Sequence, residues 1–171
     1  MKLIAVSDSK TRRDFLKVPK TLYRKDPFWV CPLDKDTVYA FDPEKNKLFT
    51  RGNARRWILR GDNNRLIGRI AAFYNLDLSA RNKQATGGIG WFDCINDQGA
   101  ANLLFDAARD WLRDEGMEAM DGPANLGENY MNHGLLTMGF EPQGFGMPYN
   151  APYYLELFEN FRPGIDRVAG E

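Results

Sequence analysis

The residue types best suited to chemistry stand around a short polar segment in the middle of the chain. This segment, 96–101, reads Asn-Asp-Gln-Gly-Ala-Ala and separates a strand-like run, 88–95, from an amphipathic stretch that continues to about Glu115. The first turn of a helix presents unpaired backbone N–H groups and the positive end of the helix dipole. A strand-to-helix turn of this kind therefore suits an anionic ligand such as a pyrophosphate.

The helix after this turn is the clearest element in the sequence. Its apolar residues recur at helical spacing on one side, and polar and charged residues take the other side. The apolar set is Ala101, Leu104, Phe105, Ala108, Trp111 and Leu112. A stripe of this width has to cover a sheet, and residues 118–121 are expected to form the next strand after Gly116 ends the helix.

Strand-like runs precede the turn. Residues 55–60 and 65–74 flank Gly-Asp-Asn-Asn at 61–64, which predicts a hairpin. Residues 2–6 predict a further short strand, and Asp8 with its two serine neighbours offers an N-cap for a helix after it.

Several segments interrupt or join these elements. Pro19 is expected to end or bend the first helix, and the aromatic- and proline-rich segment 21–43 is expected to lack regular structure and to form a lid or lie over a groove. Residues 75–86 predict an exposed loop, and 135–138 a short helix ending at Gly139. The order of elements predicts a mixed α/β (α+β) fold, and 171 residues predict a single domain, 1–171.

Composition argues against several classes of partner and site. Lys and Arg total 23, Asp and Glu total 23, and no run of about 18 apolar residues occurs, so neither a nucleic acid nor a membrane is expected as a partner. The short apolar start predicts no leader and a cytoplasmic location. Cys31 and Cys94 are expected to be free thiols, and a lone His133 without CxxC or HExxH spacing predicts no metal site.

Five short runs occur in an order that resembles the GNAT superfamily of acyl-CoA-dependent N-acetyltransferases, over residues 54–140. They are Trp57-Ile58-Leu59, Gly68-Arg69-Ile70-Ala71-Ala72, Gly90-Trp91-Phe92-Asp93-Cys94, the helix with Leu103-Leu104, and Leu136-Thr137-Met138-Gly139-Phe140. The resemblance implies a mostly antiparallel central sheet flanked by helices. It divides the chain into N-terminal helices and the aromatic segment (1–50), the core (54–140), and a C-terminal helix with a truncated tail (141–171).

The whole chain also resembles the N-terminal half of longer bacterial GNAT-like proteins of unassigned substrate. The runs that carry this resemblance are Leu22-Tyr23, Gly68-Arg69-Ile70-Ala71, Gly122-Pro123, Met147-Pro148-Tyr149-Asn150 and Tyr153-Tyr154.

The GNAT resemblance implies transfer of an acetyl or other acyl group from acyl-CoA to an amine, whose identity the sequence does not indicate. The protein would polarise the thioester carbonyl with a strand backbone N–H and remove a proton from the amine. The implied catalytic residues are Asp93, Glu128 and Tyr130. The implied acyl-CoA-binding residues are Phe92, Cys94, Asn96, Asp97, Gln98, Gly99, Ala100, Ala101 and Asn129.

Departures from the family pattern leave an alternative open, in which the chain is an inactive binding or dimerisation module. The family's turn carries Arg or Gln, then Gly three residues later, then Gly or Ala; here Ile95, Gln98 and Ala100 occupy those positions. A register that starts on Gln98 instead puts Ala101 at the position where the family's turn has its first glycine. Leu135 stands where a general-acid tyrosine is common. A missing last strand would leave an open sheet edge, which favours a homodimer.

Overall fold

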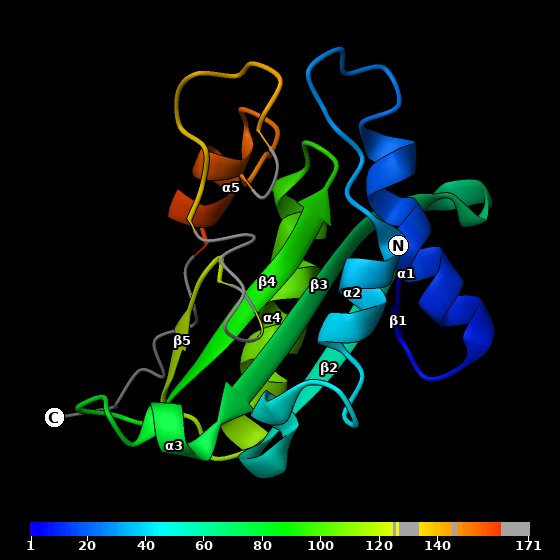
Figure 1. Cartoon of the computed structure of the whole chain (residues 1–171). Helices are drawn as coiled ribbons and strands as arrows, with labels where there is room; N and C mark the ends of the chain where they lie inside the picture. Colours follow the sequence, from blue (N-terminus) through cyan, green and yellow to red (C-terminus); the bar gives the residue numbers. More distant parts are fainter. Residues whose placement is uncertain (125, 127–133, 145–146, 162–171) are drawn as a thin grey trace, which may run out of the picture.

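The computed structural model describes residues 1–124, 126, 134–144 and 147–161, and its centre is a five-stranded sheet. The strands lie side by side in chain order (Figure 1): β1 Lys2–Ala5, β2 Gly52–Arg60, β3 Leu66–Asn75, β4 Thr86–Cys94 and β5 Ala119–Asp121. Each pair from β1 to β4 is antiparallel, and β5 is parallel to β4. The β4–β5 connection runs through the long helix α4, Gln98–Asp114, as a parallel pair requires.

Helices cover both faces of the sheet (Figure 1). The described helices besides α4 are α1 Ser9–Leu22, α2 Asp34–Ala40, α3 Leu76–Ser79 and α5 Tyr154–Glu159, with 3-10 turns at Lys47–Arg51 and Asp62–Asn64. Successive strand residues face opposite sides. Ile70 and Ala72 of β3 pack in the cluster that contains the apolar face of α4, whereas Ala71 and Phe73 pack in the cluster that contains Phe15 of α1.

The predicted fold class, a mixed and mostly antiparallel sheet flanked by helices, is confirmed. The hairpin forms with the turn at 61–64, and β4, α4 and β5 follow in the expected order. All six apolar residues predicted for the inner face of α4 are buried. Gly116 adopts a φ of 85°, a left-handed conformation that favours glycine just beyond a helix end.

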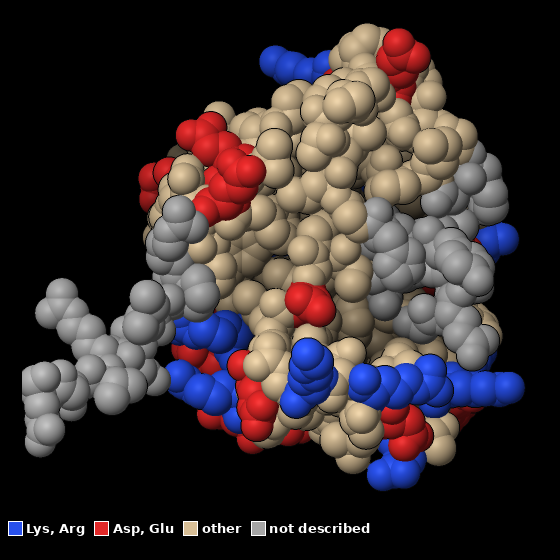
Figure 2. Space-filling model, turned by 90° about the vertical axis from the view of Figure 1, so that its left-hand side faces the viewer, with Lys and Arg blue, Asp and Glu red and all other residues tan. Residues whose placement is uncertain are grey.

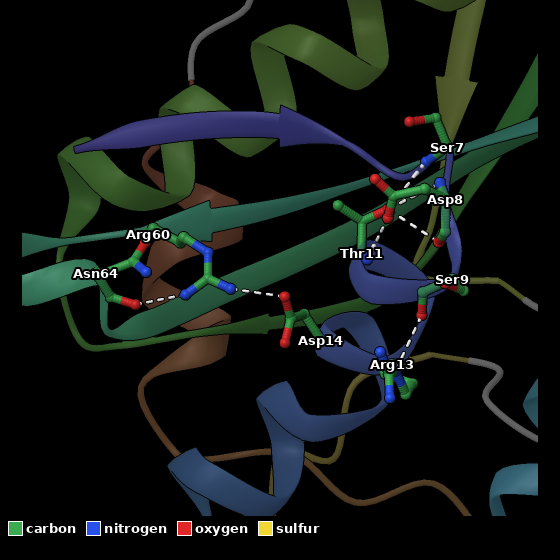
Figure 3. A network of polar contacts seen from close by, with 8 residues as sticks. All are labelled: Ser7, Asp8, Ser9, Thr11, Arg13, Asp14, Arg60 and Asn64. Atoms are coloured by element: carbon green, nitrogen blue, oxygen red, sulfur yellow. Dashed lines mark hydrogen bonds and ion pairs between the residues drawn. The ribbon is translucent and has the colours of Figure 1, made fainter.

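Helix α1 is fixed at its start and along its length by polar contacts (Figure 3). Asp8 caps it and forms a reciprocal capping box with Thr11, because each residue's side chain accepts the other's backbone N–H. Asp14 and Arg60 form an ion pair of 2.6 Å that ties the helix to the end of β2.

Local structure differs from the sequence prediction in four places. Pro19 does not end α1, because it lies in the last turn, where its carbonyl still accepts the N–H of Tyr23 at 2.9 Å. Helix α2 forms within 21–43, and α3 forms within 75–86 with Asn75 as its N-cap.

The fourth difference is at 135–138, where the predicted helix is absent. The Asn150 side chain explains this. Its Oδ1 accepts the Leu136 N–H at 2.7 Å, and its Nδ2 donates to the Leu136 carbonyl at 3.2 Å. Both backbone groups of Leu136 are thus paired with a side chain 14 positions away and are not available to a helix.

A β-bulge in β4 determines which side chains face which side of the sheet. Arg69 is opposite Asp93 but Ala71 is opposite Gly90, so Trp91 and Phe92 together oppose Ile70. Trp91 takes a φ of 47°, which a non-glycine residue rarely adopts. The strand β5 pairs only with Thr86–Gly88, so β4 extends beyond its parallel neighbour at the bulge.

The strand β4 is also crowded at Gly90, which gives a test of this packing. A Cβ on Gly90 would overlap the carbonyl oxygen of Ala124, whereas a Cβ on Gly144 would meet only the sulfur of Met147, at 3.5 Å. We expect Gly90→Ala to lower the free energy of unfolding by about 1–3 kcal/mol or more, and Gly144→Ala to change it by less than about 0.5 kcal/mol. Urea unfolding of both variants measures this. Equal stability of the two variants would contradict the close packing of the Ala124 carbonyl oxygen against Gly90.

Candidate functional site

A large cavity lies beside the bulge of β4. Its volume is about 1150 Å³, above the roughly 300–1,000 Å³ of usual small-molecule pockets. Most of its lining comes from three parts of the chain: the segment 29–48 around α2, the sheet residues Arg69 and 91–93, and residues of 134–144 and 147–150 together with α5. The remaining lining residues are Pro19, Asn75, Leu78, Pro123 and Leu126. Its lining is mostly apolar, with Trp29, Leu33, Trp91, Phe92, Leu135 and Met147 among its members. Figure 2 views the side that carries β5 and α5, where uncharged side chains dominate the centre.

An ion pair is buried in the cavity wall. Arg69 and Asp93 face each other on β3 and β4, and the Arg69 Nε lies 2.6 Å from the Asp93 Oδ2. Both residues are less than a tenth exposed. Arg69 also donates to the Phe15 carbonyl at 3.0 Å, and its guanidinium lies 4.7 Å from the Phe15 ring centroid. The guanidinium is therefore fixed from the sheet and from α1.

Two tyrosines extend this pair into a chain of hydrogen bonds. The Tyr23 hydroxyl donates to the Tyr154 hydroxyl at 2.9 Å, and Tyr154 donates to the Asp93 Oδ1 at 3.4 Å. The same Tyr154 oxygen accepts the backbone N–H of Cys94 at 2.9 Å, and Tyr153 donates to the Cys94 carbonyl at 2.7 Å. Burial raises the pKa of Tyr23 and of Tyr154 well above the ordinary value, so both hydroxyls stay protonated as donors.

The surroundings of Asp93 suit a group that accepts a proton. Burial raises the pKa of its carboxyl above the ordinary value of 3.8, and the Arg69 guanidinium opposes this shift. Asp93 also lines the cavity, so a ligand there can reach it. A carboxylate with a raised pKa, at the wall of a mostly apolar cavity, has the properties of a general base.

The predicted phosphate-binding turn lies away from the cavity, since none of residues 96–101 lines it. Asp97 caps α4 and accepts the Ala100 N–H at 2.7 Å, and Gln98 donates to the Asn102 side chain at 2.9 Å and to the Leu157 carbonyl at 3.1 Å. A pyrophosphate would meet the negative charge of Asp97 at the helix start. The turn as described does not fit that group, and phosphate binding by residues 96–101 remains a prediction.

The other predicted residues fall into three groups. Phe92 lines the cavity and stacks on Phe105 of α4, with ring centroids 4.7 Å apart. Cys94 is buried under α5, and both of its backbone groups are paired with tyrosine hydroxyls. Glu128, Asn129 and Tyr130 lie outside the described residues. In the part of the chain that the structure describes, no cluster of potential metal ligands occurs.

Sequence reasoning missed the partners of Asp93. Arg69 was visible as the one charged residue in the run Leu-Ile-Gly-Arg-Ile-Ala-Ala-Phe at 66–73, and a cation among strand residues that are otherwise apolar signals a buried partner. Tyr23 and Tyr154 gave no such signal. They are 131 positions apart and meet only in the folded chain.

The two cysteines are both free, as expected, and differ in reactivity. Burial, with the nearby Asp97 and Asp93 charges, raises the pKa of Cys94 to about 12, whereas Cys31 is exposed. Since the thiolate is the reactive form, we expect iodoacetamide to label Cys31 in the native chain and Cys94 only after denaturation. Intact-mass spectrometry counts the labels. Equal labelling of both thiols in the native chain would contradict the burial of Cys94.

The cap at α4 allows a test of the turn. We expect Asp97→Ala to lower the free energy of unfolding by about 0.5–2 kcal/mol, because the Ala100 N–H loses its acceptor, and Asp97→Asn to retain most of this stability. Titration calorimetry with CoA gives the second readout. Binding that strengthens in Asp97→Asn would support a pyrophosphate at this turn, and no binding by any of the three proteins would count against one.

Comparison with known proteins gives two curated relatives and one solved structure. Protein YghO of Escherichia coli (strain K12) is 30% identical over 161 residues, and a bacterial ceramide synthase of Caulobacter vibrioides (strain NA1000 / CB15N) is 31% identical over 156 residues. These matches cover 91% and 90% of this chain and 40% of each relative, so the chain spans about two fifths of their length. A solved structure titled "Putative acetyl transferase from Pyrococcus furiosus" is similar at 12% identity and a TM-score of 0.45, over 72% of this chain and 83% of that one. No protein-family model matches.

Proposed function

We propose that this chain forms the acyl- and amine-binding part of an N-acyltransferase that joins a long acyl chain to the amine of a long-chain base. The observation that carries the proposal is the position of Asp93, at the wall of a large, mostly apolar cavity and beside the bulge in β4. The relative of C. vibrioides named as a ceramide synthase gives the class of product, because a ceramide is the amide of a long-chain amino alcohol.

The geometry supplies two things that this chemistry needs. Apolar side chains from three segments provide a surface against which hydrocarbon can be buried, at about 0.8 kcal/mol for each methylene group. Asp93 provides a carboxylate that can take the proton lost when an amine becomes an amide. Arg69 and Tyr154 hold the two oxygens of this carboxylate and thus fix its orientation.

The resemblance predicts acyl-CoA, acetyl-CoA included, as the acyl donor. The described turn does not fit a pyrophosphate, so the proposal concerns the acyl chain and the amine, not the carrier. The size of the cavity favours an acyl chain longer than acetyl.

A second candidate is a module that binds acyl chains without transferring them. The observation in its favour is the pairing of the β4 backbone: Tyr153 and Tyr154 occupy the carbonyl and N–H of Cys94, which the resemblance assigns to the acyl carrier. Transfer of an acyl group by the purified chain would rule this candidate out.

The test has a binding arm and a transfer arm. In the first, the purified chain is titrated with a fluorescent long-chain fatty acid and competed with acetate, which should not displace it. In the second, a long-chain acyl-CoA is combined with a long-chain amino alcohol, and the amide is detected by mass spectrometry. Saturable binding with amide formation supports the proposal, and binding alone supports the second candidate. No binding of the fatty acid would overturn both.

A further inference from the structure

We propose that the end of the molecule formed by two segments, 24–35 and the described residues 134–144 and 147–150, binds the surface of an anionic phospholipid bilayer and receives the long-chain substrates of the cavity from it. The choice of a bilayer rests on the proposed function, since long-chain acyl groups and amines reside in membranes.

The first observation is that the two segments form one structural unit. They extend side by side beyond the same end of the sheet, at the top of Figure 1, and α3 lies at the opposite end. The Tyr149 hydroxyl donates to the Asp26 Oδ2 at 2.6 Å, and the rings of Tyr23 and Tyr149 lie 5.9 Å apart. Both segments also line the cavity.

The second observation is the unusual exposure of apolar side chains on this unit. Met138 is 78% exposed, Met147 61%, Val30 60%, Leu33 50% and Phe28 42%. Val30, Leu33 and Met147 also line the cavity, so the apolar surface runs continuously from its interior to the exposed rim. A hydrocarbon chain that moves from a bilayer into the cavity along this rim would not have to cross a polar surface.

The third observation is the charge beside these side chains. Arg24, Lys25 and Lys35 are exposed, and none forms an ion pair with another described residue. Asp34 pairs with Lys20 at 2.6 Å, whereas Asp26 accepts a hydrogen bond from the uncharged Tyr149 hydroxyl and Asp36 directly follows Lys35. Glu141 is the exposed acid of the second segment. Unpaired basic groups next to exposed apolar side chains suit an anionic lipid surface, which each basic group near it favours by about 1 kcal/mol.

This inference differs from the expectation that composition gave, which was no membrane partner. In the described residues no helix is long and apolar enough to cross a bilayer. Binding at a surface needs no such helix, because its strength depends on the apolar area that is buried and on the attraction to anionic lipids.

The test compares two double variants that introduce the same charges on the rim and away from it. Phe28→Asp with Met138→Asp alters the rim without touching a cavity-lining residue, and Leu76→Asp with Leu103→Asp alters exposed leucines of α3 and α4. Each protein is floated with vesicles of phosphatidylethanolamine and phosphatidylglycerol in equal parts, and with phosphatidylcholine vesicles. We expect the wild type and the Leu76/Leu103 variant to bind the anionic vesicles, and the Phe28/Met138 variant to bind them about tenfold or more weakly.

The wild type's failure to float with anionic vesicles would overturn the inference, and so would equal binding by the two double variants. Sedimentation of the same proteins tests whether a second copy of this chain, and not a bilayer, binds the rim. A wild-type dimer that becomes monomeric in the Phe28/Met138 variant would assign the rim to a second copy and would also overturn the inference.

Fatty-acid binding in buffer without vesicles separates this inference from the proposed function. Rim-dependent floating without fatty-acid binding would remove the proposed function and leave the membrane surface in place. Fatty-acid binding without floating would remove the membrane surface and leave the proposed function in place.

Discussion

Replacing Arg69 by methionine is expected to lower the free energy of unfolding by about 3–5 kcal/mol, because it leaves the Asp93 carboxylate in the cavity wall without its cation. Asp93 is 7% exposed, so water from the cavity replaces the guanidinium only in part at the lost 2.6 Å contact. Urea unfolding at neutral pH measures the change. The double variant Arg69→Met with Asp93→Leu is expected to recover much of the loss, since it removes both charges.

Two controls make this result specific. Arg109→Met removes a partly exposed cation that pairs with Asp106 and Asp110 on α4, and it should cost no more than about 1 kcal/mol. The second control is pH. Burial raises the folded-state pKa of Asp93, so the stability linked to this group is present below its unfolded pKa and is lost as pH rises through the folded value. Without Arg69 the folded pKa rises further, and the cost of Arg69→Met should shrink on acidification. A loss that is the same at all pH values would contradict this account.

Replacing Asp93 by asparagine is expected to lower the rate of acyl transfer by about 10²–10⁴-fold, the usual contribution of a general base. The amide keeps an oxygen for Arg69 but cannot accept the proton of the amine. The rate should be measured as kcat and KM separately, with the circular dichroism of each protein recorded at the assay temperature. A loss confined to kcat in a folded protein assigns Asp93 to the chemical step.

The pH profile and a surface variant complete this test. The wild-type rate should fall as pH drops through the pKa of Asp93, which burial places above the ordinary 3.8, and this inflection should be absent from Asp93→Asn. Asp106→Asn, an exposed substitution on α4, should leave the rate unchanged. A full rate in Asp93→Asn would exclude Asp93 as the base, and the proton acceptor would have to be sought elsewhere in the site.

The sequence predicted some features well because they depend on neighbouring residues. The spacing of Leu104, Phe105 and Trp111 is a property of one helix, and the turn at 61–64 joins adjacent strands. Asp93 was a candidate because the GNAT resemblance implies a base at this strand, and the structure places Asp93 on the cavity wall. Its catalytic role remains a prediction.

One prediction was wrong because a distant residue binds the same backbone groups. The helix expected at 135–138 is absent because Asn150 takes both backbone groups of Leu136. The turn 96–101 follows β4 as expected but does not line the cavity, and its Gln98 side chain donates to the Leu157 carbonyl of α5. No local pattern contains this information.

The sequence by itself therefore determined the succession of strands along the chain, the long helix α4 and its inner face, because hydrophobic periodicity and turn chemistry are local. Only the tertiary structure decided the site. The bulge at Trp91 and Phe92 determines which side chains of β4 face the α1 side, and the register of β3 against β4 brings Arg69 to Asp93. Packing of the folded chain then brings Tyr23 and Tyr154, which are 131 positions apart, into hydrogen-bond contact beside Asp93. Buried polar groups must find partners wherever the fold places them.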